Sequence, residues 1–191
     1  VASVRNGPCW PRGRSESRVQ EGGRCAGRLI GGIMRGLAVL ASVSGFWEIT
    51  MQEHLAQLSA TLKAMPPVVA LGIEVDHYHD HQLSLRAPLA ANLNDKGNAF
   101  GGSLASILTL SGWGLVSLEL AAAGLQADVY VADSRVRYLA PLYGDLLASA
   151  RLDEEASWEV FLTRFAERGH ASVNLVAQVL ADGRPAATLS G

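Results

Sequence analysis

The hydrophobic and polar positions from residue 51 onward recur with helical spacing in some segments and alternate in others. In Glu53–Ala64, the side chains of Leu55, Leu58 and Leu62 lie on one helical face, and Pro66 then stops the pattern. This segment predicts a short amphipathic helix. A second amphipathic helix is predicted over Trp158–Phe165, which ends near Gly169.

A much longer helix is predicted over Gly101–Gly124, where no charge occurs before Glu119. Small and apolar residues surround this helix on every side, so it must be buried all round or span a membrane. The uncharged run Ala99–Leu118 is long enough for a bilayer. It contains several Ser, Thr and Gly residues, however, and alternating strands follow it without flanking Lys or Arg or an aromatic belt. We therefore predict a buried central helix.

The remaining segments alternate as strands do. Ile73–Pro88 predicts two strands around a polar turn at His77–His81. Ala171–Leu180 and Arg184–Ser190 predict a hairpin that turns at Ala181-Asp182-Gly183. The other two alternating segments are Asp128–Leu139 and Asp145–Leu152. Strands segregated from a single long helix indicate an α+β fold, an antiparallel sheet wrapped around that helix. Alternation in Asp128–Leu139 places Tyr130, Ser134 and Tyr138 on the helix-facing side, with Arg135 and Arg137 opposite.

The first fifty residues differ from the rest of the chain in charge and pattern. They carry seven arginines, no lysine and three glutamates, about +4, whereas residues 51–191 carry nine basic and fifteen acidic residues, about −6. Residues 1–28 are rich in Gly, Arg, Ser and Pro, a composition that buries too little surface to fold. We expect residues 1–50 to be a disordered or non-native upstream extension, with Met51 as the true start, and residues 51–191 to be the domain.

Cysteine usage and charge exclude several classes of function. Cys9 and Cys25 both lie in the first segment, so the domain has no thiol for a disulfide or for cysteine catalysis. Its acidic balance and the absence of a basic stripe argue against nucleic-acid binding. His77, His79 and His81 share one face of an extended segment, but HYHDH also fits a solvated turn, so no metal site is predicted.

Two strings at matching separation carry a family resemblance. PLAANLNDKGNAFGGSLASI, followed by DSRVRYLAPLYGDL, resembles the thioesterase domain known as the YiiD C-terminal domain. The loop within it is similar to the N-x-x-G-x-x-H-G-G signature of hotdog-fold acyl-CoA thioesterases of the phenylacetic-acid-degradation type, with Phe100 in place of the histidine. The resemblance implies the hotdog fold for residues 52–191 and a thioesterase activity.

The paired glycines at the start of the long helix suit that chemistry. Gly101 and Gly102 leave backbone N–H groups free at the positive end of the helix, with no side chain in the way. A thioester carbonyl gains negative charge as water attacks it, so donors aimed at its oxygen lower the barrier. The alternative is that the glycines only permit a tight turn. Phe100 and Ser103, which flank the pair, are candidate substrate-binding residues.

The sequence offers more than one candidate for the residue that would activate water. Asn94 matches the asparagine of the signature, although Asn in such a loop often bonds its own backbone. Asp95 is the nearest carboxylate to the glycines and the candidate general base, although it also fits a solvated loop acid. In related families a helix acid follows the glycine pair by about seven residues. Here Thr109 occupies that position, and it cannot take the proton from water at neutral pH.

Three hypotheses follow. Asp95 is the base; or Asn94, Thr109 and Ser134 only position water; or the domain binds acyl-CoA without hydrolysing it, as a non-catalytic module. A hotdog hydratase is the weakest alternative, because no histidine lies in the loop.

The principal prediction is a cytoplasmic hydrolase of acyl-CoA or acyl carrier protein thioesters. It needs no cofactor beyond the CoA of the substrate. Arg135 and Arg137 are candidates for the CoA phosphates, or alternatively surface partners of nearby acids. Because hotdog families generally form the acyl pocket between subunits, the resemblance implies a homodimer or homotetramer; neither nucleic acid nor membrane is expected as a partner.

Overall fold

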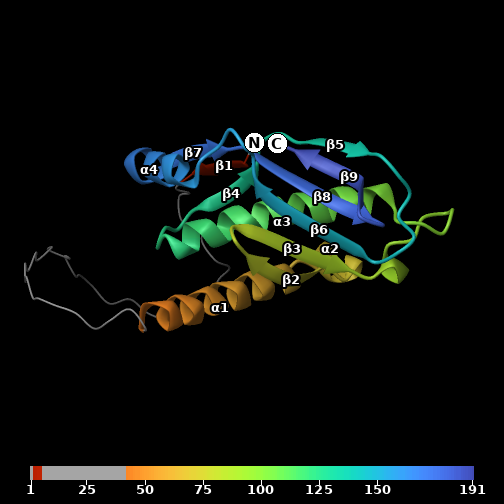
Figure 1. Ribbon diagram of the computed structural model, residues 1–191, viewed down its shortest axis with the longest axis horizontal. Coiled ribbons are helices and arrows are strands. Elements are labelled where there is room, and N and C mark those ends of the chain that lie inside the picture. The colour runs from red at the N-terminus through yellow and green to blue at the C-terminus, as the bar shows by residue number, and fades with distance from the viewer. Residues whose placement is uncertain (1, 6–41) are drawn as a thin grey trace, which may run out of the picture.

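The computed structural model describes residues 2–5 and 42–191, and its main part is a six-stranded antiparallel sheet with one long helix across it (Figure 1). The strands lie in the order β2-β3-β6-β8-β9-β5. Their bounds are β2 (Glu74–His79), β3 (Gln82–Ala87), β5 (Arg135–Tyr138), β6 (Leu146–Leu152), β8 (Leu175–Ala181) and β9 (Arg184–Ser190). The predicted α+β arrangement, an antiparallel sheet around a central helix, is confirmed.

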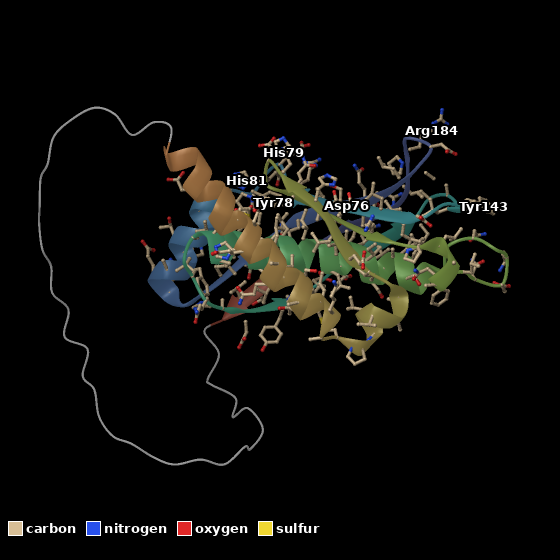
Figure 2. All side chains as sticks on the ribbon, turned by 90° about the horizontal axis from the view of Figure 1, so that it is seen from below. Asp76, Tyr78, His79, His81, Tyr143 and Arg184 are labelled. Atoms are coloured by element: carbon tan, nitrogen blue, oxygen red, sulfur yellow. The ribbon has the colours of Figure 1, made fainter. Side chains whose placement is uncertain are left out.

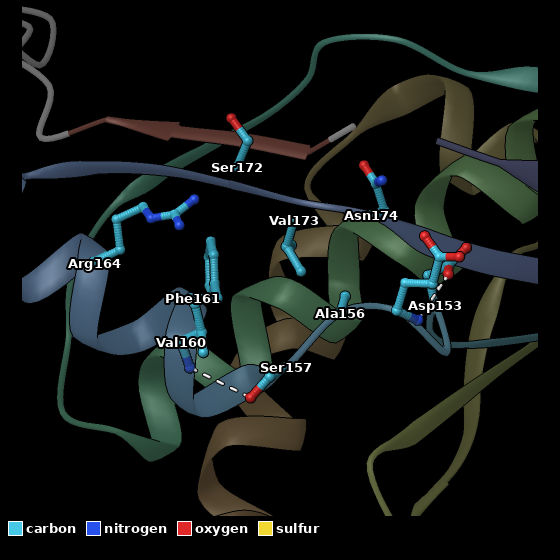
Figure 3. Close-up of a pocket in the computed structure, with 10 residues that line it drawn as sticks. Asp153, Ala156, Ser157, Val160, Phe161, Arg164, Ser172, Val173 and Asn174 are labelled. Carbon is cyan, nitrogen blue, oxygen red and sulfur yellow. Dashed lines mark hydrogen bonds between the residues drawn. The ribbon is translucent and has the colours of Figure 1, made fainter.

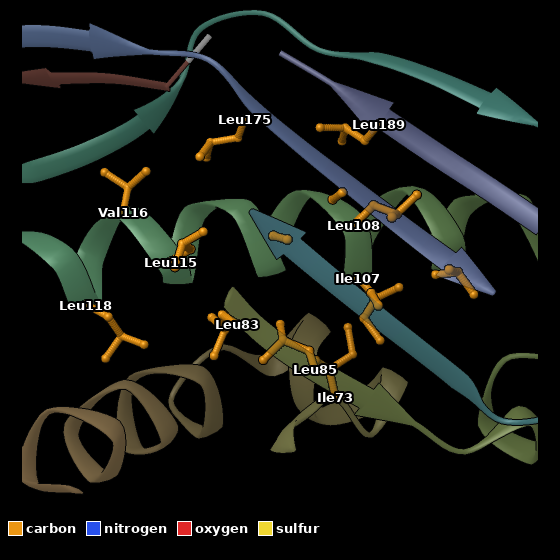
Figure 4. Close-up of a cluster of buried hydrophobic side chains, with 14 of the residues drawn as sticks. Ile73, Leu83, Leu85, Ile107, Leu108, Leu115, Val116, Leu118, Leu175 and Leu189 are labelled. Atoms are coloured by element: carbon orange, nitrogen blue, oxygen red, sulfur yellow. The ribbon is translucent and has the colours of Figure 1, made fainter. Parts of the chain in front are cut away.

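The central helix, α3 (Gly101–Ala122), packs against strands on both halves of the sheet and against the N-terminal helix α1. It ends just before the predicted end because Gly124 takes a φ of 70° and the Leu125 amide donates to the Leu120 carbonyl at 2.9 Å. Figure 4 shows side chains of α3 meeting those of β3, β8 and β9 in one cluster. Those of Leu83, Leu85, Ile107, Leu108, Leu115 and Val116 are fully buried.

Within the described residues, α3 is also the one helix with the length and composition to cross a membrane. However, 61% of its most apolar stretch is buried inside the protein. The helix is therefore covered by its own sheet, as the sequence analysis predicted for a helix that is apolar on every face.

Two helices precede the sheet. α1 (Ser42–Lys63) is followed by α2 (Pro66–Leu71), which begins with proline in its first turn, where a missing N–H costs nothing, and ends at Gly72 with a φ of 65°. Leu58 and Leu62 are buried as the pattern predicted. The predicted start at Glu53 is wrong, because α1 begins upstream of Met51, at Ser42.

A small second sheet contains a strand that the sequence analysis did not predict. β1 (Ala2–Arg5) lies between β4 (Asp128–Val131) and β7 (His170–Val173) and is antiparallel to both. Residues 2–5 and 42–50 therefore belong to a strand and a helix, although they precede the predicted domain boundary. Residues 1 and 6–41 lie outside the described residues, and the expectation of a disordered or non-native extension stays a prediction for them.

The predicted strand Asp128–Leu139 is in fact two strands, and the break reverses the alternation. In β5, Val136 is half-buried and Tyr138 contacts the start of α3, so the prediction holds there. In β4 the half-buried residue is Val129, whereas Tyr130 is 58% exposed. The extra residues at positions 132–134 change which side chains face inward. The helix-facing placement of Tyr130 is therefore wrong, and Ser134, within the break, is exposed.

α4 (Trp158–Arg168) confirms the second predicted amphipathic helix. Ser157 caps it by accepting a hydrogen bond from the Val160 amide at 3.4 Å, and Gly169 ends it with a φ of 69°. Phe161 and Phe165 are its buried side chains. The hairpin between β8 and β9 turns at Asp182 and Gly183 as predicted, and both residues have positive φ.

A buried carboxylate joins the β2–β3 hairpin to the C-terminal half of α3. Glu119 is 5% exposed, and its Oε1 accepts a hydrogen bond from the Tyr78 hydroxyl at 2.7 Å. The same oxygen lies 2.8 Å from Nδ1 of His81. Tyr78 and His81 both come from the hairpin, near its turn (Figure 2). A buried charge is tolerated only with such partners, so these contacts hold the hairpin against the helix.

The first prediction concerns the core. Replacement of the fully buried Ile107 by alanine removes apolar contacts on both sides of α3 and leaves a cavity. We expect the free energy of unfolding, measured with urea, to fall by about 2–5 kcal/mol. Leu147→Ala is the matched control: its side chain is 47% exposed on β6, and the expected change is within about 0.5 kcal/mol. Equal losses in the two variants would contradict the described core.

The second prediction concerns Tyr78. Burial, together with the hydrogen bond and charge of Glu119, raises the pKa of Tyr78 well above its ordinary value of 10.0. Tyr78 thus stays protonated in the folded protein at pH values where the unfolded chain ionises, so its stabilising effect is complete below about pH 10 and is lost as the pH rises further. Urea unfolding at about pH 9 and about pH 11 should show a larger loss of stability in the wild type than in Tyr78→Phe. The same loss in both proteins would contradict this assignment.

Candidate active site

The loop before α3 is held in place by Asn92, a residue that the sequence analysis did not single out. Its side chain is 2% exposed, and its Nδ2 donates to the carbonyls of Leu71 and Pro88, each at 2.8 Å. The backbone carbonyl of Asn92 accepts a hydrogen bond from the Phe100 amide at 2.7 Å. Asn92 therefore ties the end of α2 to the residue that precedes α3. In the sequence, the only sign of this role is that Asn92 is a single amide side chain in an otherwise apolar stretch, PLAAN.

The first turn of α3 carries free backbone donors. Among the described residues, no acceptor takes a hydrogen bond from the amides of Gly101, Gly102 or Ser103, and Phe100 at the N-cap provides no side-chain cap. Ser103 itself is buried. The N-terminus of this long helix thus has the positive partial charge and the unpaired N–H groups that bind an oxyanion.

Two aromatic rings border this turn. A Cβ added at Gly102 would lie 2.3 Å from a ring carbon of Phe100, so glycine leaves room for that ring. Tyr138 extends from β5, and its hydroxyl donates to the Gly101 carbonyl at 3.1 Å. Both rings are more than half exposed. Tyr138 was present in the family string but was not proposed as a site residue; it fixes β5 beside the start of the helix.

Asn94 is engaged within its own loop. Its Oδ1 accepts from the amides of Lys96 and Asn98, at 2.8 and 3.2 Å, and its Nδ2 donates to the Asn98 side chain at 2.7 Å. This is the turn-forming role that the sequence analysis named as the alternative. Asp95 extends into solvent with its side chain 79% exposed, and its carboxylate oxygens lie 3.0 Å from Nζ of Lys96.

Thr109 lies between two hollows. On one side is an apolar groove of about 660 Å³. Its lining comes from the α1–α2 turn, from α2 and from the first half of α3: Ala64, Met65, Pro66, Pro67, Val68, Leu71, Ala105, Ser106, Thr109 and Leu110. On the other side is a small cavity of about 20 Å³, which Thr109 shares with Asp133 and Ser134. Thr109 and Ser134 thus border the same cavity, and Ser134 lies at the protein surface.

The two arginines proposed for CoA lie on the edge strand β5. Arg137 borders a hollow of about 540 Å³ that crosses the outer face of the sheet, together with Arg151 and polar residues of β8 and β9. Arg135 is paired in register with Ser190 and is exposed. Neither arginine lines the groove beside Thr109.

A fourth hollow, of about 340 Å³, lies between α4 and β7 (Figure 3). Two of its polar side chains have local structural roles: Ser157 caps α4, and Asp153 accepts from the Glu155 amide at 3.2 Å. We assign no reaction to it. Of the three histidines near the β2–β3 turn, His77 lies 2.6 Å from Asp76 and His81 contacts Glu119. The described part of the chain holds no group of three metal-binding side chains.

Other proteins are similar to this chain in fold and in part of their sequence. A family model described as "Putative thioesterase (yiiD_Cterm)" matches residues 55–191. A solved structure from Shewanella oneidensis, named as a "putative thioesterase", is 32% identical with a TM-score of 0.66 and covers 73% of this chain and 95% of its own. A protein of unknown function from Chlorobaculum tepidum is 28% identical with a TM-score of 0.70, and covers 74% of this chain and 93% of its own.

A further solved structure, a "probable thioesterase" from Pseudomonas aeruginosa, is 25% identical with a TM-score of 0.61 and covers 71% of this chain and 90% of its own. The similarity of fold extends to other thioesterase-superfamily proteins, which confirms the hotdog architecture. Because the family model spans most of the chain and includes both the loop before α3 and the β5 strand, the chain belongs to the hotdog-fold thioesterase family of the YiiD C-terminal type.

Proposed function

We propose that the domain hydrolyses acyl thioesters of CoA or acyl carrier protein to the free acid and the thiol. The observation that carries this proposal is the adjacency of two features on α3. Its first turn has free amides at Gly101, Gly102 and Ser103, and the helix then forms one wall of an apolar groove. The turn offers donors for a developing oxyanion, and the groove offers an apolar surface for an acyl chain.

The reaction follows from this arrangement. Water attacks the thioester carbonyl, and the carbonyl oxygen becomes an oxyanion beside the free amides. The C–S bond then breaks, the carboxylic acid is released, and the proton lost by water is taken up by the leaving thiolate. The donors are fixed by the helix before the reaction begins, so they need no reorganisation as the negative charge develops.

Thr109 is the residue that we propose to position the water. It lies two helical turns beyond the glycines, and it is shared by the groove and by the cavity that Ser134 borders. Its hydroxyl can hold water but cannot act as a base at neutral pH. Asp95 stays a candidate base, and its exposure means that it would act on a substrate bound at the surface or enclosed by a second subunit.

The substrate and assembly are part of the same proposal. The groove residues carry no charged side chain, which suits an acyl group, and Arg135 and Arg137 on the exposed edge strand suit the phosphates of CoA. A homodimer or homotetramer would cover the open side of the site, with CoA entering only as part of the substrate. We propose a cytoplasmic location, where acyl-CoA is available, with neither nucleic acid nor membrane as a partner.

A second function is favoured by one observation. No carboxylate lines the groove, and the helix position seven residues beyond Gly102 is threonine. A domain with oxyanion donors and an acyl groove but no base would bind an acyl thioester without hydrolysing it.

The third prediction tests the amide donors. Gly101→Pro deletes one N–H at the first helical position, which tolerates proline, and Phe100 already has the extended conformation that a following proline requires. Gly101→Ala is the matched control, because it adds a Cβ at an ordinary 3.5 Å from the Tyr138 ring and keeps the N–H. With a panel of acyl-CoAs and a thiol reagent, we expect the proline variant to lose about 100-fold in kcat relative to the alanine variant. Equal rates would contradict a role for this amide.

The fourth prediction tests Thr109. Thr109→Val keeps the shape of the side chain and removes its hydroxyl, so we expect thiol release to slow by about tenfold or more, the equivalent of one lost hydrogen bond in the transition state. Thr61→Val is the control, because Thr61 lies on α1 and its hydroxyl donates to the Gln57 carbonyl at 2.9 Å, within the same helix. Binding of a non-hydrolysable acyl-CoA analogue without turnover of any acyl-CoA would favour the binding module. The absence of both binding and turnover would contradict both functions.

A further inference from the structure

The near end of the apolar groove is fixed to the turn that carries the free amides. Ser106, which lines the groove, donates through its hydroxyl to the Gly102 carbonyl at 2.9 Å. On the α2 wall, the Leu71 carbonyl accepts a hydrogen bond from the side chain of Asn92, whose backbone carbonyl accepts from the Phe100 amide. Both walls of the groove are therefore held at a set position relative to the first turn of α3.

The far end of the groove is closed by α1. The last residue of α3 in its lining is Leu110. One turn later, at Gly114, the Leu58 side chain of α1 lies so close that a Cβ added to the glycine would be 3.3 Å from it. The two helices run in opposite directions and pack against each other (Figure 1). An extended ligand that follows α3 from its first turn therefore meets α1 at Gly114.

The length of the groove corresponds to a medium-length acyl chain. Leu110 lies eight residues beyond Gly102 in α3, which is about 12 Å along the helix axis. With C–C bonds of about 1.5 Å in a zigzag, an extended hydrocarbon chain advances about 1.25 Å per carbon, so about ten carbons reach Leu110. Gly114 lies about 18 Å from Gly102, where a chain of about fourteen carbons would collide with α1.

The polarity of the lining indicates what kind of chain fits. Apart from Ser106 and Thr109, every residue that lines the groove is apolar. The Ser106 hydroxyl already bonds the Gly102 carbonyl, so Thr109 is the one lining side chain with a polar group that has no partner within the described residues. A hydroxyl or carboxylate on the distal part of an acyl chain would lose its hydrogen bonds to water without gaining a protein partner. The groove therefore suits an unsubstituted aliphatic chain.

We infer that the substrate is a straight, unsubstituted acyl thioester of about eight to twelve carbons, and that Ala105 and Leu110 set its length. This inference rests on the proposed function, because it takes the thioester to lie at the first-turn amides of α3. Ala105 leaves the near part of the groove open with a single methyl group, and Leu110 borders the far part just before α1. Each CH₂ that enters the groove adds apolar contact until α1 is reached.

The test compares straight-chain acyl-CoAs with the full chain, by release of free thiol. Over a series from about four to about sixteen carbons, kcat/KM should rise about fourfold for each CH₂ up to about ten carbons. It should fall again for chains of about fourteen carbons or more, which collide with α1. Decanoyl-CoA with a hydroxyl on its last carbon should react at least about tenfold more slowly than decanoyl-CoA.

Two variants should shift this profile in opposite directions. Ala105→Leu fills the near part of the groove and should shorten the best substrate by about four carbons, whereas Leu110→Ala should lengthen it by about two. The matched controls are Ala122→Leu, on α3 but outside the groove, and Leu162→Ala, a partly buried leucine of α4; both should leave the optimum unchanged. The optimum compares substrates on one protein, so a lower folded fraction does not move it, and Ala105→Leu decides if Leu110→Ala does not fold.

The outcomes separate this inference from the proposed hydrolysis. If no acyl-CoA is turned over, the same series is measured as binding of non-hydrolysable acyl-CoA thioethers, and a binding optimum that the two groove variants shift supports the length limit although hydrolysis fails. Turnover with a flat profile, or with an optimum that the groove variants and the controls leave alike, overturns the length limit while hydrolysis stands. Equal rates for decanoyl-CoA and its hydroxylated form overturn the preference for an unsubstituted chain. The lack of both turnover and binding overturns the inference together with the proposed function.

Discussion

The constraint on which the structure depends is that α3 is apolar on every face. Such a helix needs most of its surface covered, and the strands on both halves of the sheet do so together with α1, except along the face that lines the groove. The fully buried Ile107, Leu108 and Leu115 are the consequence. The free backbone donors of α3 lie in its first turn, which begins with two glycines, next to the part of the helix that lines the groove.

The two ends of α3 satisfy their polar groups differently. Near the C-terminal end, Glu119 carries a negative charge toward the negative end of the helix dipole, which is unfavourable without partners. Tyr78 and His81 provide them, and the result is a closed contact with a structural role. At the N-terminal end, the amides of the first turn have no acceptor among the described residues. Asn92 and Tyr138 bond to Phe100 and to the Gly101 carbonyl, so they hold the turn whose amides are the donors in the proposed function.

The sequence predicted those features whose interactions lie between residues close together in the chain. α3, α4 and the β8–β9 hairpin depend on periodicity, caps and turn residues that lie within the segment itself, and all three were predicted. β1 could not be, because four residues of mixed character become a strand only through β4 and β7, far away in the chain. Asn92 was missed for a similar reason: its importance rests on bonds to Leu71 and Pro88 that no local pattern shows. Asn94 was singled out by family likeness and Asp95 as the carboxylate nearest to the glycine pair, and the structure shows turn bonding for the first and exposure for the second.

The break at residues 132–134 connects these parts of the molecule. A continuous strand would have kept Tyr130 and Tyr138 on one face, as simple alternation requires. Instead, Val129 turns inward beside Val4, and Tyr138 reaches the Gly101 carbonyl. The segment thus serves two sheets with opposite alternation, and Ser134 lies in the break beside the cavity that Thr109 borders. The three residues of the break thus join the strand that pairs with β1 to the strand that contacts the start of α3.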